Sequence, residues 1–209
     1  MAIPVKTISD FKSALAGGGA RPNLFEVDIP SFPTSVQSAW TQGETGHQGT
    51  LQFLAKATTL PASTIAEVPV PFRGRILKVA GDRTFADWSV TVINDEDFRL
   101  RTAFETWMNA MSRLDDATGV TNPSSYMTDA YVKQLGRGRE KFADTNNGGN
   151  SAVLRTYKLH QIFPTEVSAV DLSYETTDTV EQFDVTFQMQ WFTIGGQPGR
   201  TNSQPIAAG

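Results

Sequence analysis

Side chains that could carry catalysis or bind a metal are few and scattered in this sequence. The chain has 209 residues, two histidines and no cysteine, so thiol nucleophiles, thiolate metal ligands and disulfides are all absent. His47 lies in a polar stretch and His160 within an expected strand, and two isolated histidines supply neither a metal cluster nor a catalytic dyad. We interpret His160 as an ordinary side chain on a strand face and His47 as a solvated loop residue. No catalytic residue, metal ligand or cofactor site is predicted.

A run of acidic residues and two groups of glycines could suggest a metal or a phosphate, but their spacing argues against both. Asp95, Glu96 and Asp97 are consecutive, and consecutive residues of a helix point in different directions, so they cannot converge on one ion. We interpret them as the first turn of a helix, where the helix dipole favours negative charge. The glycines at 17–19 and at 74 lack the spacing of phosphate-binding loops, so no nucleotide site is predicted.

The one concentration of charge is basic. Arg73, Arg75, Lys78 and Arg83 lie close together in the sequence, with Asp82 among them. In an unbroken strand Arg73 and Arg75 would share one face, and Lys78 would lie on the other. The cluster could be a solvated face, or it could face carboxylates of a neighbouring copy, because arginine suits ion pairs at interfaces. Nucleic-acid binding fits least, because interleaved aromatic residues are missing, so these five residues are the candidate contacts between subunits.

The amino-acid composition limits the kind of protein that this chain can be. With 39% apolar residues and 13 phenylalanines, the chain can bury one core, and we predict a single domain over 1–209. Charged residues make up 19%, below the usual quarter, so part of the surface is expected to meet protein. The net charge of −4 and the pI near 5.2 provide no basic field that would attract phosphates.

No targeting or membrane-spanning segment is predicted. The N-terminal residues lack the apolar core of a signal peptide, and no run of eighteen apolar residues occurs. We therefore expect a soluble protein made in the cytoplasm. Residues 1–22 are interpreted as an N-terminal arm that contains a short amphipathic helix, Ile8 to Ala16.

Alternating apolar and polar residues predict a mainly β fold. Residues 23–29 alternate with a period of two, and residues 51–59 and 65–70 are two further candidate strands. Pro69 and Pro71 interrupt the third of these, and proline is typical of edge strands. The fold is therefore expected to place this third strand at an edge.

The residues that follow predict a hairpin leading into a strong strand. Gly81 and Asp82 mark its turn. Beyond the turn, Trp88, Val90 and Val92 alternate with polar residues. These three residues are predicted to lie in the core.

One helix is predicted, over about residues 95–114. Asn94 is its expected N-cap, and Gly119 lies just past its end. Apolar residues recur at helical spacing, so one wide aromatic face should lie on a sheet. This face consists of Phe104, Trp107, Met108, Met111 and Leu114, of which Phe104, Trp107 and Met111 are predicted core residues.

The clearest alternation runs from Val180 to Ile194, after an earlier candidate strand at 155–163. One face of this long strand is apolar and the other is polar but nearly uncharged. The apolar face is predicted to lie in the core and contains Phe183, Val185, Phe187, Met189 and Trp191. Three polar segments are predicted to be irregular: a long loop at 31–50, a region at 115–150 that includes an exposed loop at 136–150, and a flexible tail at 195–209.

Long stretches of the sequence resemble the tail tube proteins of contractile-tailed bacteriophages. The resemblance extends over about residues 23–194 and is strongest from Pro71 to Met111, where an R-G-R sequence, a G-D-R sequence, a tryptophan-bearing strand and an acidic segment follow in order. The matching stretches are NLFEVDI, FLAKATTLPAS, PFRGRILKVAGDRTFADWSVTVINDEDFRLRTAFETWMNAM and EQFDVTFQMQWF. No catalytic motif takes part in the resemblance.

The resemblance implies a β-sandwich or barrel-like tail tube fold with one flanking helix and long loops. It implies a structural virion protein whose homohexameric rings stack into a hollow inner tail tube, which conducts phage DNA without specific binding and templates a contractile sheath. By analogy, residues 31–50 would be a stacking loop between rings. Expected partners are further copies of the chain, the sheath protein, the baseplate or tube initiator and the tail terminator. The location would be a virion tail assembled in the host cytoplasm, with no cofactor and no membrane anchor.

Two other functions are kept as alternatives. The same fold serves type VI secretion tubes, R-type bacteriocins and extracellular injection systems, so the chain could be the tube subunit of a device that carries protein. It could also be a monomeric β-sandwich binding module, which would need an aromatic cluster or a groove on a strand face. A self-assembling structural subunit is favoured over this module and over an enzyme.

Overall fold

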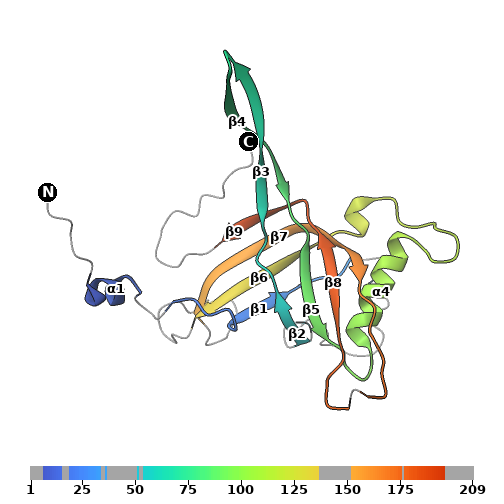
Figure 1. Ribbon diagram of the computed structural model, residues 1–209. Coiled ribbons are helices and arrows are strands. Elements are labelled where there is room, and N and C mark those ends of the chain that lie inside the picture. The colour runs from blue at the N-terminus through green and yellow to red at the C-terminus, as the bar shows by residue number, and fades with distance from the viewer. Residues whose placement is uncertain are drawn as a thin grey trace.

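The computed structural model describes residues 7–15, 19–33, 36, 51, 54–136, 152–175 and 177–195 of the protein (Figure 1). The described part is mainly β, with one sizeable helix, as predicted. Its elements in chain order are α1 (Ile8–Ala14), β1 (Phe25–Asp28), β2 (Ala55–Thr58), β3 (Ser63–Phe72), β4 (Arg75–Phe85), β5 (Trp88–Ile93), α4 (Arg99–Met111), the 3-10 turn η1 (Pro123–Ser125), β6 (Thr128–Gly136), β7 (Ala152–Val167), β8 (Gln182–Gln188) and β9 (Trp191–Gly195).

Seven strands form one antiparallel sheet that bends around the core (Figure 1). The strand order is β1-β6-β7-β8-β5-β2, and β9 pairs with β7 outside this path. Within the described residues the sheet does not close into a barrel, because β1 and β2, at the two ends of the path, are not paired with each other. The strands β3 and β4 form a separate two-stranded sheet.

The bend of the large sheet lies in the middle of β7. The first part of β7 pairs with β6 and β9, and the last part pairs with β8. Between these parts Gln161 adopts a left-handed conformation, with φ 53°, and its backbone N–H donates a hydrogen bond to Asp129 Oδ1 at 3.1 Å. Leu159 and Ile162, three residues apart, are both fully buried, so the inward-facing register shifts by one residue at this bend.

The predicted single strand from Val180 to Ile194 is wrong, because the sheet bends in this region. The chain forms two strands, β8 and β9, that pair with opposite ends of β7. The predicted residues Phe183, Val185, Phe187 and Met189 are buried, but Trp191 is 40% exposed and stacks on the His160 ring. Trp191 was wrongly predicted as a core residue because the alternation shifts where the strand is interrupted, and Phe192 packs against the core instead.

The core is built from the inner face of the bent sheet and one face of α4. Trp88, Val90 and Val92 of β5 are buried, and so are Phe104 and Trp107 of α4, all as predicted. The Phe104 ring lies 5.7 Å from Phe187 and 6.5 Å from Phe183, centroid to centroid, in the edge-to-face arrangement that aromatic pairs favour. Met111 packs against this core from the end of the helix.

Both ends of the predicted helix at 95–114 were placed wrongly. The helix begins at Arg99, and its N-cap residue is Phe98, which is in a left-handed conformation. The side chain of Asp95, which lies before the helix, accepts a hydrogen bond from the Arg99 N–H at 3.0 Å. Asn94 is therefore not the N-cap. Leu114 lies beyond the helix and is 97% exposed. Gly119 crosses over the helix end, where a Cβ would lie 1.9 Å from the Met111 carbonyl oxygen.

Two further predictions fail in the middle of the chain. Gly81 and Asp82 are not a turn but lie within β4, at an irregularity in its pairing with β3. Residues 115–150 are not wholly irregular, because they include β6. The alternation of β6 is obscured by Lys133, which is 8% exposed and whose Nζ lies 2.8 Å from Glu26 Oε1 on β1.

Most of the predicted loops lie outside the described residues. This holds for 37–50 within the loop 31–50, for 137–150, for the tail from residue 196, and for His47. The predicted short N-terminal helix is α1, which begins with a capping box between Thr7 and Asp10. No helix in the described ranges is long and apolar enough to cross a membrane.

The Asp129 carboxylate at the bend should make stability depend on pH. Burial is the largest single influence on Asp129 and raises its pKa, but the hydrogen bonds from Lys158 and the Gln161 N–H, with the charges of Lys158 and His160, outweigh burial and hold the pKa below its ordinary 3.8. A carboxyl group whose pKa is lowered by folding stabilises the fold above its unfolded pKa, and this contribution is lost as the pH falls through the folded pKa.

We therefore expect Asp129→Asn to lower the free energy of unfolding at pH 7 by about 0.5–1 kcal/mol, a small value because the carboxylate is partly screened by solvent. The difference from the wild type should begin to shrink below about pH 4, where the carboxyl group of the unfolded chain becomes neutral, and should be smallest below the lowered pKa of the folded protein. Urea unfolding at pH 7 and at pH 3 measures both differences. An equal loss at the two pH values would contradict the electrostatic explanation.

Candidate assembly surface

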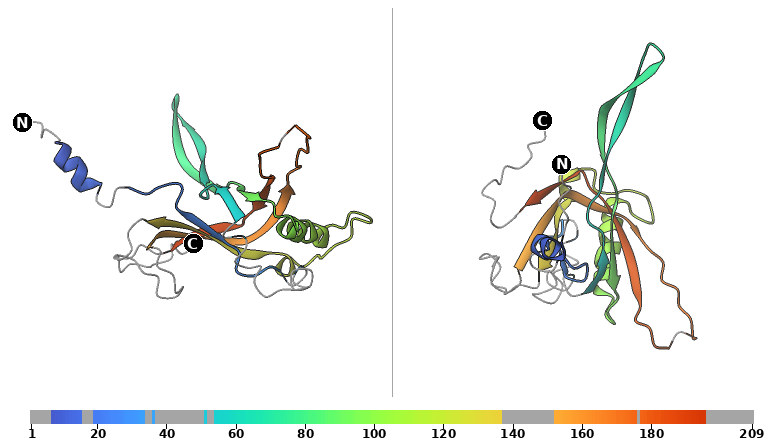
Figure 2. Two further views of the ribbon diagram at one scale, coloured as in Figure 1. Left: turned by 90° about the horizontal axis from the view of Figure 1, so that it is seen from below. Right: turned by 60° about the vertical axis from the view of Figure 1, so that its left-hand side comes forward.

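The strands β3 and β4 form a long hairpin that projects away from the large sheet (Figures 1 and 2). Its turn consists of Arg73 and Gly74, whose φ angles are 45° and 80°. Two consecutive positive φ angles between the paired residues Phe72 and Arg75 are typical of a type I′ turn, whose twist matches that of the flanking strands. The local sequence therefore builds a tightly closed turn at the tip of the hairpin.

One face of this hairpin is apolar and exposed. Cross-strand pairs lie on the same face, and the register joins Val70 to Leu77 and Val68 to Val79. Together with Phe72 these residues form what we call the apolar face of the hairpin. Their exposed fractions are 49% for Val68, 43% for Val70, 66% for Phe72, 62% for Leu77 and 45% for Val79.

The hairpin is not expected to be stable on its own in an isolated subunit. A two-stranded hairpin is at best marginally stable in water without a covered apolar face. In the described part of the chain, β3 and β4 pair only with each other, so both outer edges also present unpaired backbone donors and acceptors, which are ready to pair with another chain. Both features indicate a surface that becomes buried in an assembly.

The base of the hairpin is held firmly by the core. The Trp88 Nε1–H donates to Thr58 Oγ1 at 2.9 Å and to the Thr59 carbonyl oxygen at 3.1 Å. The Ala86 N–H donates to the Ala62 carbonyl oxygen at 3.0 Å. Because Trp88 is fully buried, these bonds fix the hairpin base to the centre of the fold.

All five residues predicted as contacts between subunits lie on this hairpin. Arg73 occupies the turn, with its guanidinium carbon 5.3 Å from the centroid of the Phe72 ring, so the unbroken strand assumed for Arg73 and Arg75 does not exist. Arg75 shares the face of Phe72, and Lys78 lies on the opposite face. Asp82 and Arg83 follow at the irregularity nearer the base.

The charges of the hairpin are only partly neutralised within it. Lys78 Nζ lies 2.8 Å from Glu67 Oε2, with both side chains mostly exposed. Arg75 and Arg83 form no ion pair with any residue that the structure describes. The apolar face itself was missed at the sequence level, although Gly74, between two apolar stretches, could have indicated the turn of the hairpin that carries it.

The remaining candidate for chemistry is His160. It lies on β7 as expected, stacks on Trp191 with the ring centroids 5.1 Å apart, and its Nε2 lies 2.9 Å from Thr193 Oγ1. Burial, followed by the charge of Lys158, lowers its pKa below the ordinary 6.5. Among the described residues no group of three or more His, Asp or Glu side chains could hold a metal ion.

The projecting hairpin, its exposed apolar face and its unpaired edges define a class of protein: a β-structured subunit made for assembly. Comparison with known proteins narrows this class. A family model described as phage tail tube protein matches residues 20–194. The tail tube protein gp19 of Enterobacteria phage T4 is 32% identical over 178 residues, which cover 85% of this chain and 93% of gp19. The chain therefore belongs to the phage tail tube protein family, and its place is the tail of the virion.

Solved structures share the fold at much lower sequence identity. A chain of the sheath and tube terminator of an extracellular contractile injection system aligns with a TM-score of 0.55 and 10% identity, over 87% of this chain and 99% of that one. A chain of the six-fold symmetrised baseplate of the anti-feeding prophage aligns with a TM-score of 0.55 and 12% identity, over 85% and 96%. The fold is therefore common to tail tubes and contractile injection machines.

Proposed function

We propose that six copies of this chain form a ring and that rings stack into the hollow inner tube of a contractile tail. Phage DNA passes through this tube, and the tube templates the surrounding sheath. The hairpin of β3 and β4 carries the proposal, because its exposed apolar face and unpaired edges are the features that a neighbouring copy would cover. Sixfold symmetry rests on the resemblance to the tube family.

The charge of the chain supports a passive conduit. A net charge of −4 gives DNA no sequence-independent attraction to the subunit as a whole, since such attraction comes from lysine and arginine that neutralise phosphates. DNA that must move along a tube is best served by walls that do not hold it. The subunit is then a structural component without enzymatic activity.

Other tail proteins would meet the two ends and the outside of such a tube. We propose a baseplate or initiator protein at one end, a terminator at the other and the sheath protein around it. The segment 31–50 is proposed as a stacking loop between rings, and the N-terminal arm and the C-terminal tail as segments that dock on neighbouring subunits. The sequence relatives favour a phage tail over a secretion device that carries protein.

The test is the state of the purified full-length chain at high concentration. Negative-stain microscopy should show six-fold rings or stacked tubes with a central hole, and light scattering should give a mass six times that of one 22.8 kDa chain or a multiple of it. Uniform monomers, even with a baseplate extract added as a nucleator, would overturn the proposal. That result would favour the monomeric binding module instead.

A further inference from the structure

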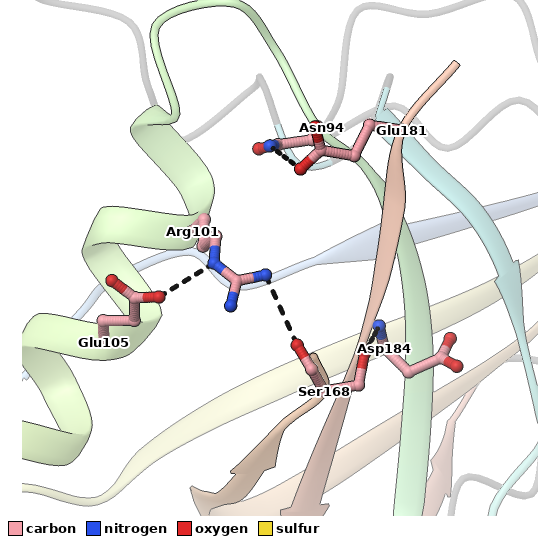
Figure 3. Close-up of polar contacts among 6 residues, drawn as sticks. All are labelled: Asn94, Arg101, Glu105, Ser168, Glu181 and Asp184. Atoms are coloured by element: carbon pink, nitrogen blue, oxygen red, sulfur yellow. Dashed lines mark hydrogen bonds and ion pairs between the residues drawn. The ribbon is translucent and has the colours of Figure 1, made fainter. Parts of the chain in front are cut away.

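The connection between β7 and β8, residues 168–181, forms a long arm that is anchored at both ends of its base (Figure 3). At its start, the Ser168 carbonyl oxygen accepts from Arg101 Nη1 at 3.3 Å, and Ser168 Oγ accepts from the Asp184 N–H at 2.9 Å. At its end, Glu181 Oε1 accepts from Asn94 Nδ2 at 2.8 Å. Residues of α4 and of the β5–α4 connection therefore fix the direction in which the arm leaves the sheet.

Beyond this anchored base the arm presents exposed apolar and acidic side chains. Leu172, Tyr174 and Val180 are 83%, 106% and 71% exposed. The arm contains four acidic residues and no basic one. These acidic residues are Asp171, Glu175, Asp178 and Glu181, and none of them forms an ion pair within the described ranges of the chain. An open hollow beside the arm is lined by Asp171, Glu181 and Asp184, among other residues.

The hairpin of β3 and β4 is complementary to this arm in charge. It contains four basic residues, Arg73, Arg75, Lys78 and Arg83, and two acidic ones, Glu67 and Asp82, which leaves a net charge of +2. Its exposed apolar face likewise matches the exposed apolar residues of the arm. Opposite charges at a contact steer association and fix its register.

The two elements also lie where copies of one chain could join them. The hairpin and the arm project to opposite ends of the subunit (Figure 1 and the right view of Figure 2), and both lean to the same side of the sheet (left view of Figure 2). Moving one copy along the direction of the hairpin brings its arm toward the hairpin of the copy behind it. Such a head-to-tail contact does not close on itself and generates a stack.

We propose that the hairpin of one copy docks on the 168–181 arm of a copy in the next ring, with the basic residues near the hairpin tip facing the carboxylates of the arm. This inference rests on the proposed tube function and adds the contact that holds successive rings together. The occupant of the arm is therefore a second copy of this chain.

Charge reversal tests this contact. Arg73→Glu combined with Arg75→Glu, at the hairpin tip, should raise the protein concentration at which rings stack by roughly tenfold or more, while single rings persist. Asp171→Lys combined with Glu175→Lys should have the same effect. A protein that carries all four substitutions should stack again, because the charges are exchanged. Arg99→Glu combined with Arg113→Glu, at exposed positions of α4 and just beyond its end, is the control for net charge and should stack as the wild type does.

Sedimentation velocity and negative-stain microscopy of the full chain, at low and at raised salt, separate the outcomes. Stacking that survives reversal of the hairpin charges would overturn this contact and leave the tube function intact. Loss of the rings themselves, without rescue by the reversed arm, would place the hairpin within a ring and would also overturn it. A wild-type chain that forms no rings at all would instead overturn the proposed function.

Discussion

Leu77→Asp is expected to abolish assembly while the subunit stays folded. Leu77 lies in the apolar face of the hairpin and is 62% exposed, so in a free subunit its carboxylate replacement would be solvated. In an interface the same carboxylate would lose its water without gaining a partner. If the cost is about 3 kcal/mol per contact, the concentration needed for assembly rises more than 100-fold.

Light scattering over a concentration series measures this shift, and urea unfolding of the dilute protein measures the stability of the subunit. The free energy of unfolding should change by less than about 0.5 kcal/mol, as is usual for exposed positions. Leu114→Asp is the matched control, because Leu114 is 97% exposed but lies beside α4, and it should assemble normally. Assembly of Leu77→Asp at wild-type concentrations would show that the apolar face is not an interface.

Trp107→Ala should cause the largest loss of subunit stability, about 3–5 kcal/mol. The Trp107 side chain is fully buried, and its ring lies 5.5 Å from Phe32 and 6.2 Å from Phe187. Its Nε1–H also donates to the Tyr126 carbonyl oxygen at 2.7 Å. Alanine would therefore leave a large cavity and an unpaired carbonyl group at the junction of α4 with the sheet.

Urea unfolding in the Leu77→Asp background measures this loss without a contribution from assembly, which would otherwise add to the apparent stability. Trp107→Phe keeps most of the packing and should cost less, because it removes the hydrogen bond and only part of the ring. Trp191→Ala is the control, since that tryptophan is 40% exposed. A loss for Trp107→Ala no greater than that for Trp191→Ala would contradict the assigned core.

The sequence predicts best where burial follows a regular period. Trp88, Val90 and Val92 are all buried because β5 pairs with β8 without a register shift, so every second residue faces the core. Phe104 and Trp107 are recognisable because helical spacing persists over α4. The candidate contacts at Arg73, Arg75, Lys78, Asp82 and Arg83 all belong to one hairpin, and their role between subunits is still a prediction.

The errors arise where a distant residue decides the local structure. Gln161 bends β7 with its N–H bonded to Asp129 of another strand, and this displaces Trp191 from the core face. Lys133 is buried beside Glu26 of β1. A charged residue at a buried position interrupts the apolar alternation of β6, so this strand was not predicted. Neither pairing is visible in the neighbouring residues, and a period of two cannot anticipate either of them.

The way the hairpin is joined to the sheet has a mechanical consequence. The strand β3 follows β2 after four residues, and β4 is followed by β5 after two, so tension on the hairpin tip would run along the chain into the sheet. The backbone hydrogen bonds of an antiparallel pair lie across the strands. When β2 and β5 are pulled lengthwise together against β8, the other neighbour of β5, many of the hydrogen bonds between β5 and β8 are sheared together instead of opening one after another. A subunit pulled through its hairpin would therefore resist unfolding, because the load falls on these hydrogen bonds. In a tube held together by such hairpins, the contacts between subunits would break before any subunit unfolded.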